Sequence, residues 1–257
     1  TGALEEAMRA LRHAVRLAGE RPEPGVALGE IYLDLGRADD AARAFARVLE
    51  RHPDHVPAHH GRGVAEAAAG RDGEAVKAFR AVLERDPAHL EARRGLARTY
   101  RRAGRLQDCL EELERACEVA AEHAPLRRDL GEVLFERGEA DRARRCFEEA
   151  LRIDPSLHDA ARRLGAMQLE EGDFEEAART LEGAARHLED DAELFDELVR
   201  AYEATGRLDA VEGAVRRGLR ADPDHPGLLC AQARMLAEAG DPAQAAPTYE
   251  RALRGDR

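Results

Sequence analysis

Small and large apolar residues recur along the chain at intervals of three and four, which is the spacing of one face of an α-helix. Ala41, Phe45 and Val48 show the pattern. It consists of a residue that is usually small, an apolar residue four positions later, and a third packing residue three positions after that. Six further triplets have the same spacing: Ala75, Phe79 and Val82; Cys109, Leu113 and Ala116; Ala143, Phe147 and Ala150; Ala177, Leu181 and Ala184; Val211, Val215 and Gly218; Ala245, Tyr249 and Ala252. Each small residue allows a neighbouring helix to approach, and each large one fills the space beside it.

Glycines and prolines divide the chain at a fixed period. Seven glycines, each five residues before a triplet, lie 34 residues apart: Gly36, Gly70, Gly104, Gly138, Gly172, Gly206 and Gly240. Glycine commonly ends a helix because it adopts the left-handed backbone conformation easily. Pro53, Pro87, Pro155 and Pro223 follow the triplets at positions where proline prevents a helix from continuing. The pattern therefore predicts helical hairpins, with one helix before each glycine and one after it.

The half of each repeat before the glycine has its own signature, as in Leu28-Gly29 with Tyr32 and Leu130-Gly131 with Leu134. With its period, this pattern resembles the tetratricopeptide repeat family. The resemblance implies an all-α fold, a right-handed α-solenoid of antiparallel helix pairs. It covers seven repeats, whose residues are numbered below as positions 1 to 34: residues 22–55, 56–89, 90–123, 124–157, 158–191, 192–225 and 226–257. Residues 1–21 match only the second helix of a partial repeat, with Ala7, Leu11 and Ala14 at its packing positions.

Some residues depart from the family pattern. The family's early Trp is absent, and Gly61 and Gly63 are expected to weaken their helix by about 1 kcal/mol each. Pro247 is expected to kink the last helix. Because each hairpin buries its apolar face only on its neighbours, a row without a polar capping helix leaves its ends uncovered. We therefore expect flanking sequence, or self-association through an end.

Composition excludes several classes of partner. The net charge of −12 argues against nucleic acid and against anionic lipid, which both need a basic surface. No apolar stretch is long enough to span a membrane, and no signal peptide is visible. Four cysteines without CxxC spacing are expected to be reduced, packed side chains, which suits the cytoplasm. A single lysine and no asparagine are typical of a GC-rich genome, and we expect a bacterial source.

Arginines are concentrated in the middle of the chain: residues 90–105 contain six Arg and one Glu. The resemblance implies that positions 2, 5, 9, 12 and 13 of each repeat line a concave surface. Arginine suits carboxylates and phosphates, and apolar groups beside it make anchors for a peptide. The expected partner-binding residues are Arg94, Arg98, Arg101, Arg102, Arg128, Arg162, Phe135 and Leu169. In the alternative, the arginines pair with Glu132, Glu136 and Glu170 on a solvated face, and the two apolar residues are core.

The sequence gives little support for metal binding or catalysis. His52, His55, His59 and His60 are close in sequence, but His55 recurs as His89 and His225, which indicates a turn residue of the repeat. We expect no metal and no cofactor, because structural zinc usually brings closely spaced cysteines. The asparagine-based carboxylate clamp of some family members cannot be carried over. No nucleophile elbow or phosphate-binding loop is present, so an enzyme is not expected.

The expected function is that of an adaptor or scaffold that binds a protein or peptide segment in the groove, and the arginines predict that this segment is acidic. A second hypothesis is a regulatory or substrate-recruiting arm of a larger enzyme or of a secretion or assembly system. A third is end-to-end stacking of copies. The repeat fold hosts many roles, so it does not decide between them.

Overall fold

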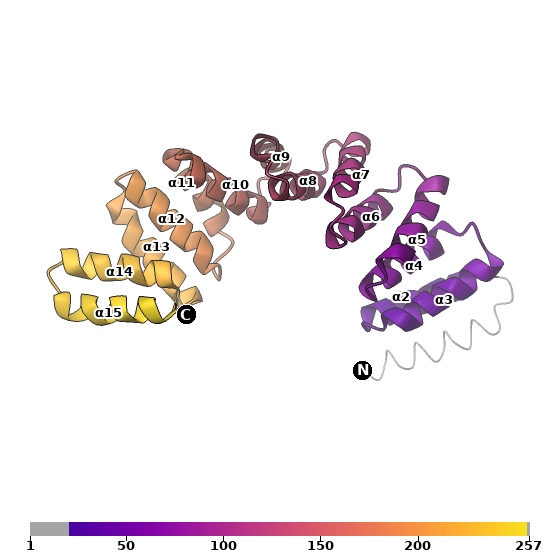
Figure 1. Ribbon diagram of the computed structural model, residues 1–257, viewed down its shortest axis with the longest axis horizontal. Helices are drawn as coiled ribbons and strands as arrows, with labels where there is room; N and C mark the ends of the chain where they lie inside the picture. The colour runs from indigo at the N-terminus through magenta and orange to yellow at the C-terminus, as the bar shows by residue number, and fades with distance from the viewer. Residues whose placement is uncertain (1–20, 256–257) are drawn as a thin grey trace. The chain divides into compact units, whose positions relative to one another are not determined.

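A computed structural model describes residues 21–255 (Figure 1), and within this range every regular element is an α-helix. The helices are α2 (Glu23–Asp34), α3 (Ala38–Arg51), α4 (Val56–Ala68), α5 (Asp72–Arg85), α6 (Leu90–Arg102), α7 (Leu106–Val119), α8 (Ala124–Glu136), α9 (Ala140–Ile153), α10 (His158–Glu171), α11 (Phe174–Ala185), α12 (Ala192–Ala204), α13 (Leu208–Ala221), α14 (Pro226–Glu238) and α15 (Pro242–Gly255). The predicted all-α repeat fold is confirmed. The partial repeat with Ala7, Leu11 and Ala14 lies outside the described residues.

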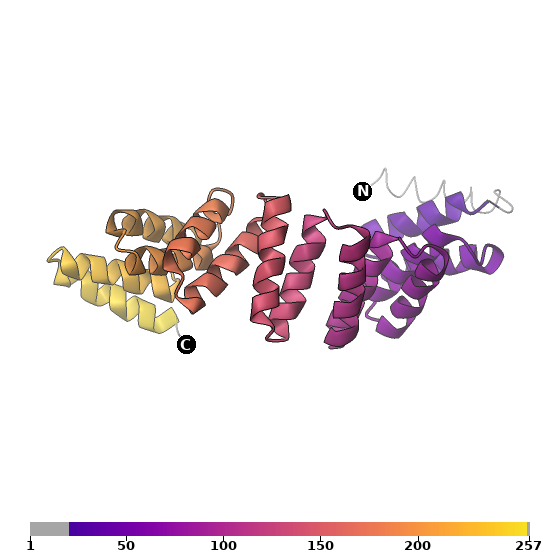
Figure 2. The same cartoon turned by 90° about the horizontal axis from the view of Figure 1, so that it is seen from above.

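The chain divides into two compact units, an N-terminal unit of residues 1–138 and a C-terminal unit of residues 139–257. In the N-terminal unit the hairpins α2–α3, α4–α5 and α6–α7 follow one another, and each second helix packs on the next first helix. In the C-terminal unit the hairpins α10–α11, α12–α13 and α14–α15 repeat this arrangement after α9. Figure 2 shows the helices of each unit lying side by side.

Each turn between paired helices depends on its glycine. All seven glycines at the 34-residue period have positive φ, between 68° and 84°. In the first turn, the N–H of Gly36 donates to the carbonyl of Leu33 at 2.9 Å, and the N–H of Arg37 donates to the carbonyl of Tyr32 at 2.8 Å. These bonds satisfy carbonyls that the end of the helix would leave unpaired. The prediction that these glycines end the first helices is confirmed.

The turns between repeats use a histidine to begin the next helix. Four histidines accept a hydrogen bond at Nδ1 from a backbone N–H three residues ahead: His55 from Ala58 (3.2 Å), His89 from Ala92 (3.2 Å), His123 from Leu126 (3.3 Å) and His225 from Leu228 (3.4 Å). Asp191 makes the same bond to Leu194 at 3.1 Å. The bond satisfies an N–H that the start of the helix would leave unpaired. The interpretation of the recurring histidine as a turn residue is confirmed.

Glycines also shape the core of the N-terminal unit. Phe45, which is fully buried, lies between Gly29 of its own repeat and Gly61 of the next. A Cβ added to Gly29 or Gly61 would lie 2.6 Å or 2.4 Å from the Phe45 ring. Phe79 lies in the same way between Gly63 and Gly95. The glycines that were expected only to weaken a helix are therefore needed for the aromatic ring to fit.

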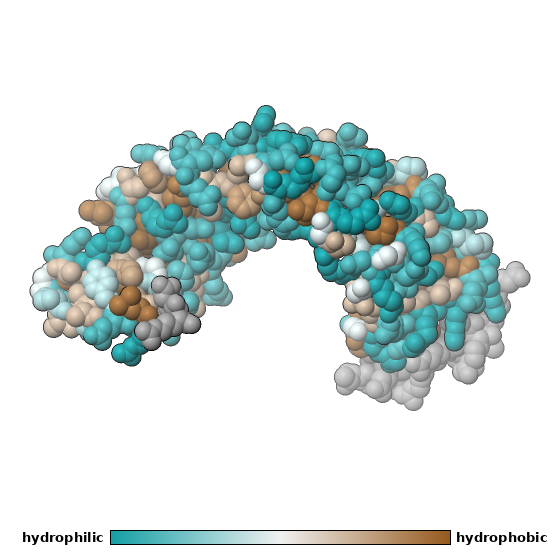
Figure 3. All heavy atoms as spheres, viewed as in Figure 1, coloured by the Kyte–Doolittle hydropathy of each residue, from teal (hydrophilic) through white to brown (hydrophobic). Residues whose placement is uncertain are grey.

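The C-terminal unit has a core of its own, built around Leu181, Leu194, Phe195 and Leu198. Its last helix, α15, has exposed apolar groups, since Leu253 is 69% exposed. On the face that Figure 3 shows, polar side chains cover most of the surface and apolar groups form small separate patches. None of the helices between residues 21 and 255 has the length and hydrophobicity needed to cross a bilayer.

All four cysteines are free thiols, and three of them, Cys109, Cys117 and Cys146, are buried as predicted. Burial raises the pKa of Cys109 to about 11. Cys230 is exposed, which corrects the expectation of four packed side chains. It occupies position 5 of its repeat, on the side of α14 that faces solvent.

Candidate partner-binding surface

The first helices of consecutive repeats form a row within each unit. In the N-terminal unit α2 contacts α4 and α4 contacts α6, and in the C-terminal unit α10 contacts α12 and α12 contacts α14. We call the solvent-facing side of such a row the first-helix face. Positions 5 and 12 of a repeat point along the row toward the next first helix, as the contacts of the arginines below show.

Arg94 and Arg101 of α6 reach across to α8. Arg94 Nη2 lies 3.4 Å from Asp129 Oδ2, and Arg101 Nε donates to Glu136 Oε1 at 2.9 Å. Arg101 Nη2 also lies 3.8 Å from Glu132 Oε2. The hydrogen bond that Arg101 donates to Glu136 raises the pKa of Arg101. These two arginines are therefore largely neutralised by carboxylates of the neighbouring repeat, as the alternative interpretation expected for Glu132 and Glu136.

Arg102 points away from α8. Its Nε donates to Asp72 Oδ1, at the first residue of α5, at 2.9 Å. It therefore does not lie beside Arg94 and Arg101, although all three were expected to share one surface. The reason is geometric, because successive residues on a helix are about 100° apart.

Arg98 differs from its neighbours on α6. It is exposed, and within residues 21–255 no carboxylate forms an ion pair with it. Arg128 of α8 is 24% exposed and lies 2.7 Å from Asp129. Phe135, the penultimate residue of α8, is partly buried. Arg98 thus presents an unpaired guanidinium between two paired ones on the first-helix face of the N-terminal unit.

The two remaining candidates belong to the C-terminal unit. Arg162 Nε lies 3.3 Å from Asp191 Oδ2, and Arg162 Nη1 lies 4.0 Å from Glu197 Oε1. Leu169 is only 5% exposed and packs in the core of this unit, which corrects its assignment as an exposed anchor. At position 12, Leu169 points toward the next first helix, α12, and is covered there, whereas Phe135 at the same position of α8 stays partly exposed.

One contact recurs in both units. Arg94 and Asp129 occupy position 5 of one repeat and position 6 of the next, and so do Arg162 and Glu197. Sequence reasoning missed Asp129, Asp72 and Asp191 as partners of the arginines. The spacings of 35, 30 and 29 residues carry no helical signal, and only the repeat position relates them.

The histidines close in sequence make local contacts. His59 Nε2 lies 2.7 Å from the carbonyl oxygen of Pro53. The ring of His60 stacks on that of His89 with their centres 5.1 Å apart. Burial and the neighbouring His89 lower the pKa of His60. Among residues 21–255, no group of His, Cys, Asp and Glu side chains is arranged to hold a metal ion.

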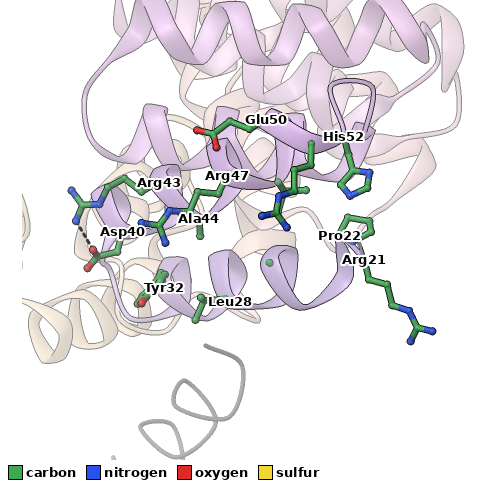
Figure 4. A pocket seen from close by; sticks show the side chains of 13 residues that line it. Arg21, Pro22, Leu28, Tyr32, Asp40, Arg43, Ala44, Arg47, Glu50 and His52 are labelled. Carbon is green, nitrogen blue, oxygen red and sulfur yellow. Dashed lines mark hydrogen bonds and ion pairs between the residues drawn. The ribbon is translucent and has the colours of Figure 1, made fainter. Parts of the chain in front are cut away.

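A cavity of about 650 Å³ lies beside α2 and α3 (Figure 4). Leu28 and Tyr32 of α2 and Ala44 of α3 line its apolar part, while Arg43 and Arg47 line its rim. The same side of α4 is covered by α3, the second helix of the preceding repeat. The cavity is therefore the place where a preceding second helix would pack, rather than evidence for a small ligand.

The helical hairpins and the first-helix face define an interaction scaffold of repeated helix pairs. Sequence profiles described as tetratricopeptide repeat match residues 26–88 and 128–193, residues 88–156, residues 168–234 and residues 226–251. The chain belongs to the tetratricopeptide repeat family.

Several solved structures share this fold. PilF of Pseudomonas aeruginosa has 18% identity, a TM-score of 0.69 and coverage of 90% of this chain and 99% of its own. A repeat protein from Cytophaga hutchinsonii has 16% identity, a TM-score of 0.71 and coverage of 89% and 94%. YrrB, described as having an unusual peptide-binding site, has 18% identity, a TM-score of 0.62 and coverage of 74% and 98%. No curated protein sequence matches the chain.

Proposed function

We propose that the protein is a non-catalytic interaction scaffold that binds an acidic segment of a partner protein on the first-helix face of the N-terminal unit. The observation that carries the proposal is Arg98. It is exposed and unpaired, and it lies on α6 between Arg94 and Arg101, each of which already forms an ion pair with a carboxylate of α8. A carboxylate of the partner can pair with Arg98 without displacing an existing partner.

The charge of the whole protein restricts where an acidic partner can bind. The chain has a net charge of −12, so an acidic segment is repelled by most of its surface and attracted only where arginines are concentrated. Phe135 of α8 offers an apolar contact in the same unit. YrrB, whose structure shares this fold, is described as binding a peptide, which supports a peptide-sized partner.

A reversed charge at Arg98 tests the proposal. A partner captured from native lysate with the wild-type chain is purified, and its Kd is measured for the variants Arg98→Glu and Arg115→Glu. Arg115 is the matched control, since it lies in the same hairpin, on the second helix α7, and is 56% exposed. We expect Arg98→Glu to weaken binding at least about tenfold, as for loss of a charged hydrogen bond, and Arg115→Glu to bind as wild type.

The circular dichroism spectrum and the melting curve of Arg98→Glu should match those of the wild type, because Arg98 makes no ion pair within the described residues. Arg115→Glu should melt within a few degrees of the wild type, since it loses only an exposed ion pair with Glu112. Equal affinity of the two variants would refute the proposal. Adding Arg128→Glu to Arg98→Glu should weaken binding further if the segment extends onto α8.

Self-association is a second candidate, supported by α15. Tyr249 occupies the position of Phe45 in the last repeat, and it is 39% exposed whereas Phe45 is fully buried. A second copy that covers this face would bury it. Sedimentation velocity over a concentration series tests this, and a monomer at every concentration would remove it. A cytoplasmic location is part of the proposal, because free thiols suit a reducing compartment.

A further inference from the structure

The first helices of the N-terminal unit differ in the charge that they present on the first-helix face. On α2, Glu23, Glu30 and Asp34 are exposed, and none of them forms an ion pair within residues 21–255. On α6 the same face carries arginines, of which Arg98 is exposed and has no ion pair in the same range. Because α2 and α6 both contact α4, the face changes from negative to positive across three helices.

The intervening helix, α4, presents no charge on this face. Apart from its histidines, its charged residues are Arg62 and Glu66, and both turn toward the second helix of their repeat. Arg62 Nη2 lies 3.4 Å from Glu74 Oε2 in α5. Glu66 accepts a hydrogen bond from Arg71, in the turn before α5. Burial lowers the pKa of His60, so its ring is uncharged at neutral pH.

Position 9 of the repeat shows what each of the three helices offers to a partner. In all seven repeats position 8 is buried and position 9 is not, so a side chain at position 9 points to solvent. The three helices place Glu30, Val64 and Arg98 at this position. We call these residues the position-9 row. It presents an exposed carboxylate, a partly buried apolar group and an exposed guanidinium, in that order.

The spacing of the position-9 row matches one conformation of a bound segment. Packed helices have their axes about 8–10 Å apart, so neighbouring members of the row are separated by about one such distance. A polyproline II segment has three residues per turn and rises about 3.1 Å per residue, so every third side chain points the same way, about 9 Å further on. In a β-strand the side chains on one face are only about 7 Å apart. A polyproline II segment that crosses the three helices therefore places one side chain over each member of the row.

We propose that the N-terminal unit recognises a segment of a partner protein in which a basic, an apolar and an acidic residue follow one another at three-residue spacing, in either chain direction. The basic residue pairs with Glu30, the apolar residue packs on Val64, and the acidic residue pairs with Arg98. This inference rests on the function proposed above, since its acidic residue is the one that Arg98 binds. It adds that the segment has mixed charge, because a uniformly acidic one would place a carboxylate against Glu30.

Synthetic peptides test the requirement for mixed charge. Ac-Arg-Pro-Pro-Leu-Pro-Pro-Glu-NH2 and its reversed sequence are both titrated into the whole chain, and the one that binds more tightly serves as the mixed peptide. The acidic peptide carries Glu in place of Arg. The Kd is obtained from the shifts of backbone amides in NMR spectra. We expect the wild type to bind the mixed peptide at least about threefold more tightly than the acidic one, with saturable shifts in α2, α4 and α6.

Reversing the charge of Glu30 should reverse this preference. In Glu30→Arg the row has a guanidinium at each end, so the acidic peptide should bind more tightly than the mixed one. The circular dichroism spectrum should not change, because Glu30 makes no ion pair within the described residues. Glu84→Arg is the matched control, since it changes the net charge equally but lies on the second helix α5, where Glu84 is 75% exposed. It should keep the wild-type preference.

A longer spacing tests the polyproline II register. Ac-Arg-Pro-Pro-Pro-Leu-Pro-Pro-Pro-Glu-NH2 no longer places its three functional side chains on one face, so it should bind at least about threefold more weakly than the peptide of the same chain direction with two prolines in each gap. Equal affinity of these two peptides would overturn the inference. So would the absence of saturable shifts with the mixed peptide, or a preference that Glu30→Arg leaves unchanged.

Arg98→Glu separates this inference from the function on which it rests. It should weaken the binding of both the mixed and the acidic peptide. If it does so while Glu30→Arg has no effect on the preference, the acidic contact stands and only the mixed-charge requirement fails. If Arg98→Glu binds both peptides as the wild type does, the acidic contact itself is refuted, and the mixed-charge requirement with it.

Discussion

Replacing Gly61 by alanine tests how tightly the repeats of the N-terminal unit are packed. The new Cβ would lie 2.4 Å from the Phe45 ring, well inside van der Waals contact. The ring cannot move aside easily, because Phe45 is fully buried and the backbone of Gly29 lies against its other side, where an added Cβ would be 2.6 Å from the ring. Forcing an extra methyl group into such a core typically costs about 1–3 kcal/mol.

Alanine also stabilises a helix relative to glycine, by about 1 kcal/mol. This gain must be removed before the packing cost is visible, and Gly213 provides the correction. It lies inside α13, and a Cβ added there meets nothing within 4 Å. Gly213→Ala should therefore stabilise the protein by about 1 kcal/mol, whereas Gly61→Ala should destabilise it by up to about 2 kcal/mol. The difference between the two changes in the free energy of unfolding is the cost of the clash.

Equilibrium urea unfolding, followed by far-ultraviolet circular dichroism, measures both free energies. A second substitution, Phe45→Leu, should reduce the cost of Gly61→Ala by about 1 kcal/mol, measured as a double-mutant cycle. The chain already holds a precedent, since Leu113 takes the place of Phe45 in a repeat that has Ala97 in place of Gly29. If Gly61→Ala stabilises the protein as much as Gly213→Ala does, the close packing inferred here is wrong.

Three further predictions concern titration, helix starts and thiols. The folded chain holds a proton on Glu197 that the unfolded chain releases between pH 4.5 and about 7, so the free energy of unfolding should fall as pH rises through this window, by roughly 2 kcal/mol, and Glu197→Gln should remove that slope in urea unfolding. His123→Ala should cost about 1 kcal/mol at pH 7, whereas His123→Asp should cost little because Asp191 makes the same bond; equal losses would contradict the capping role. In the native protein a thiol reagent should modify Cys230 rapidly and the buried Cys109 slowly, and Cys230→Ser should abolish the rapid phase.

The architecture could be predicted from sequence because its signals are local and repeated. Each glycine with positive φ and each proline after a second helix has a direct conformational meaning, and the period without insertions repeats the glycine seven times and the proline four times. The recurring histidine was recognised as a turn residue by its repeat position alone. His123 occupies the same position and was not singled out, although the period marks it equally.

The candidate surface was less predictable because its contacts join different repeats. Whether an arginine is paired depends on which side chain of the next repeat it meets, as with Arg94 and Asp129. Leu169 is buried because its side chain at position 12 points toward the neighbouring first helix. That direction depends on how adjacent first helices approach each other, which the sequence of one repeat does not show. The buried carboxyl group of Glu197 gave no sequence signal, since acidic residues are abundant throughout and only burial distinguishes this one.

The glycine-flanked phenylalanines have a consequence for how such a chain can change its length. Phe45 meets Gly61, and Phe79 meets Gly95, at the same position of the following repeat. Excision of residues 56–89 would therefore place Gly95 against Phe45, and the junction would reproduce a contact that the chain already contains. A gene encoding these hairpins can thus lose or duplicate one by recombination without creating a mismatched interface at the join.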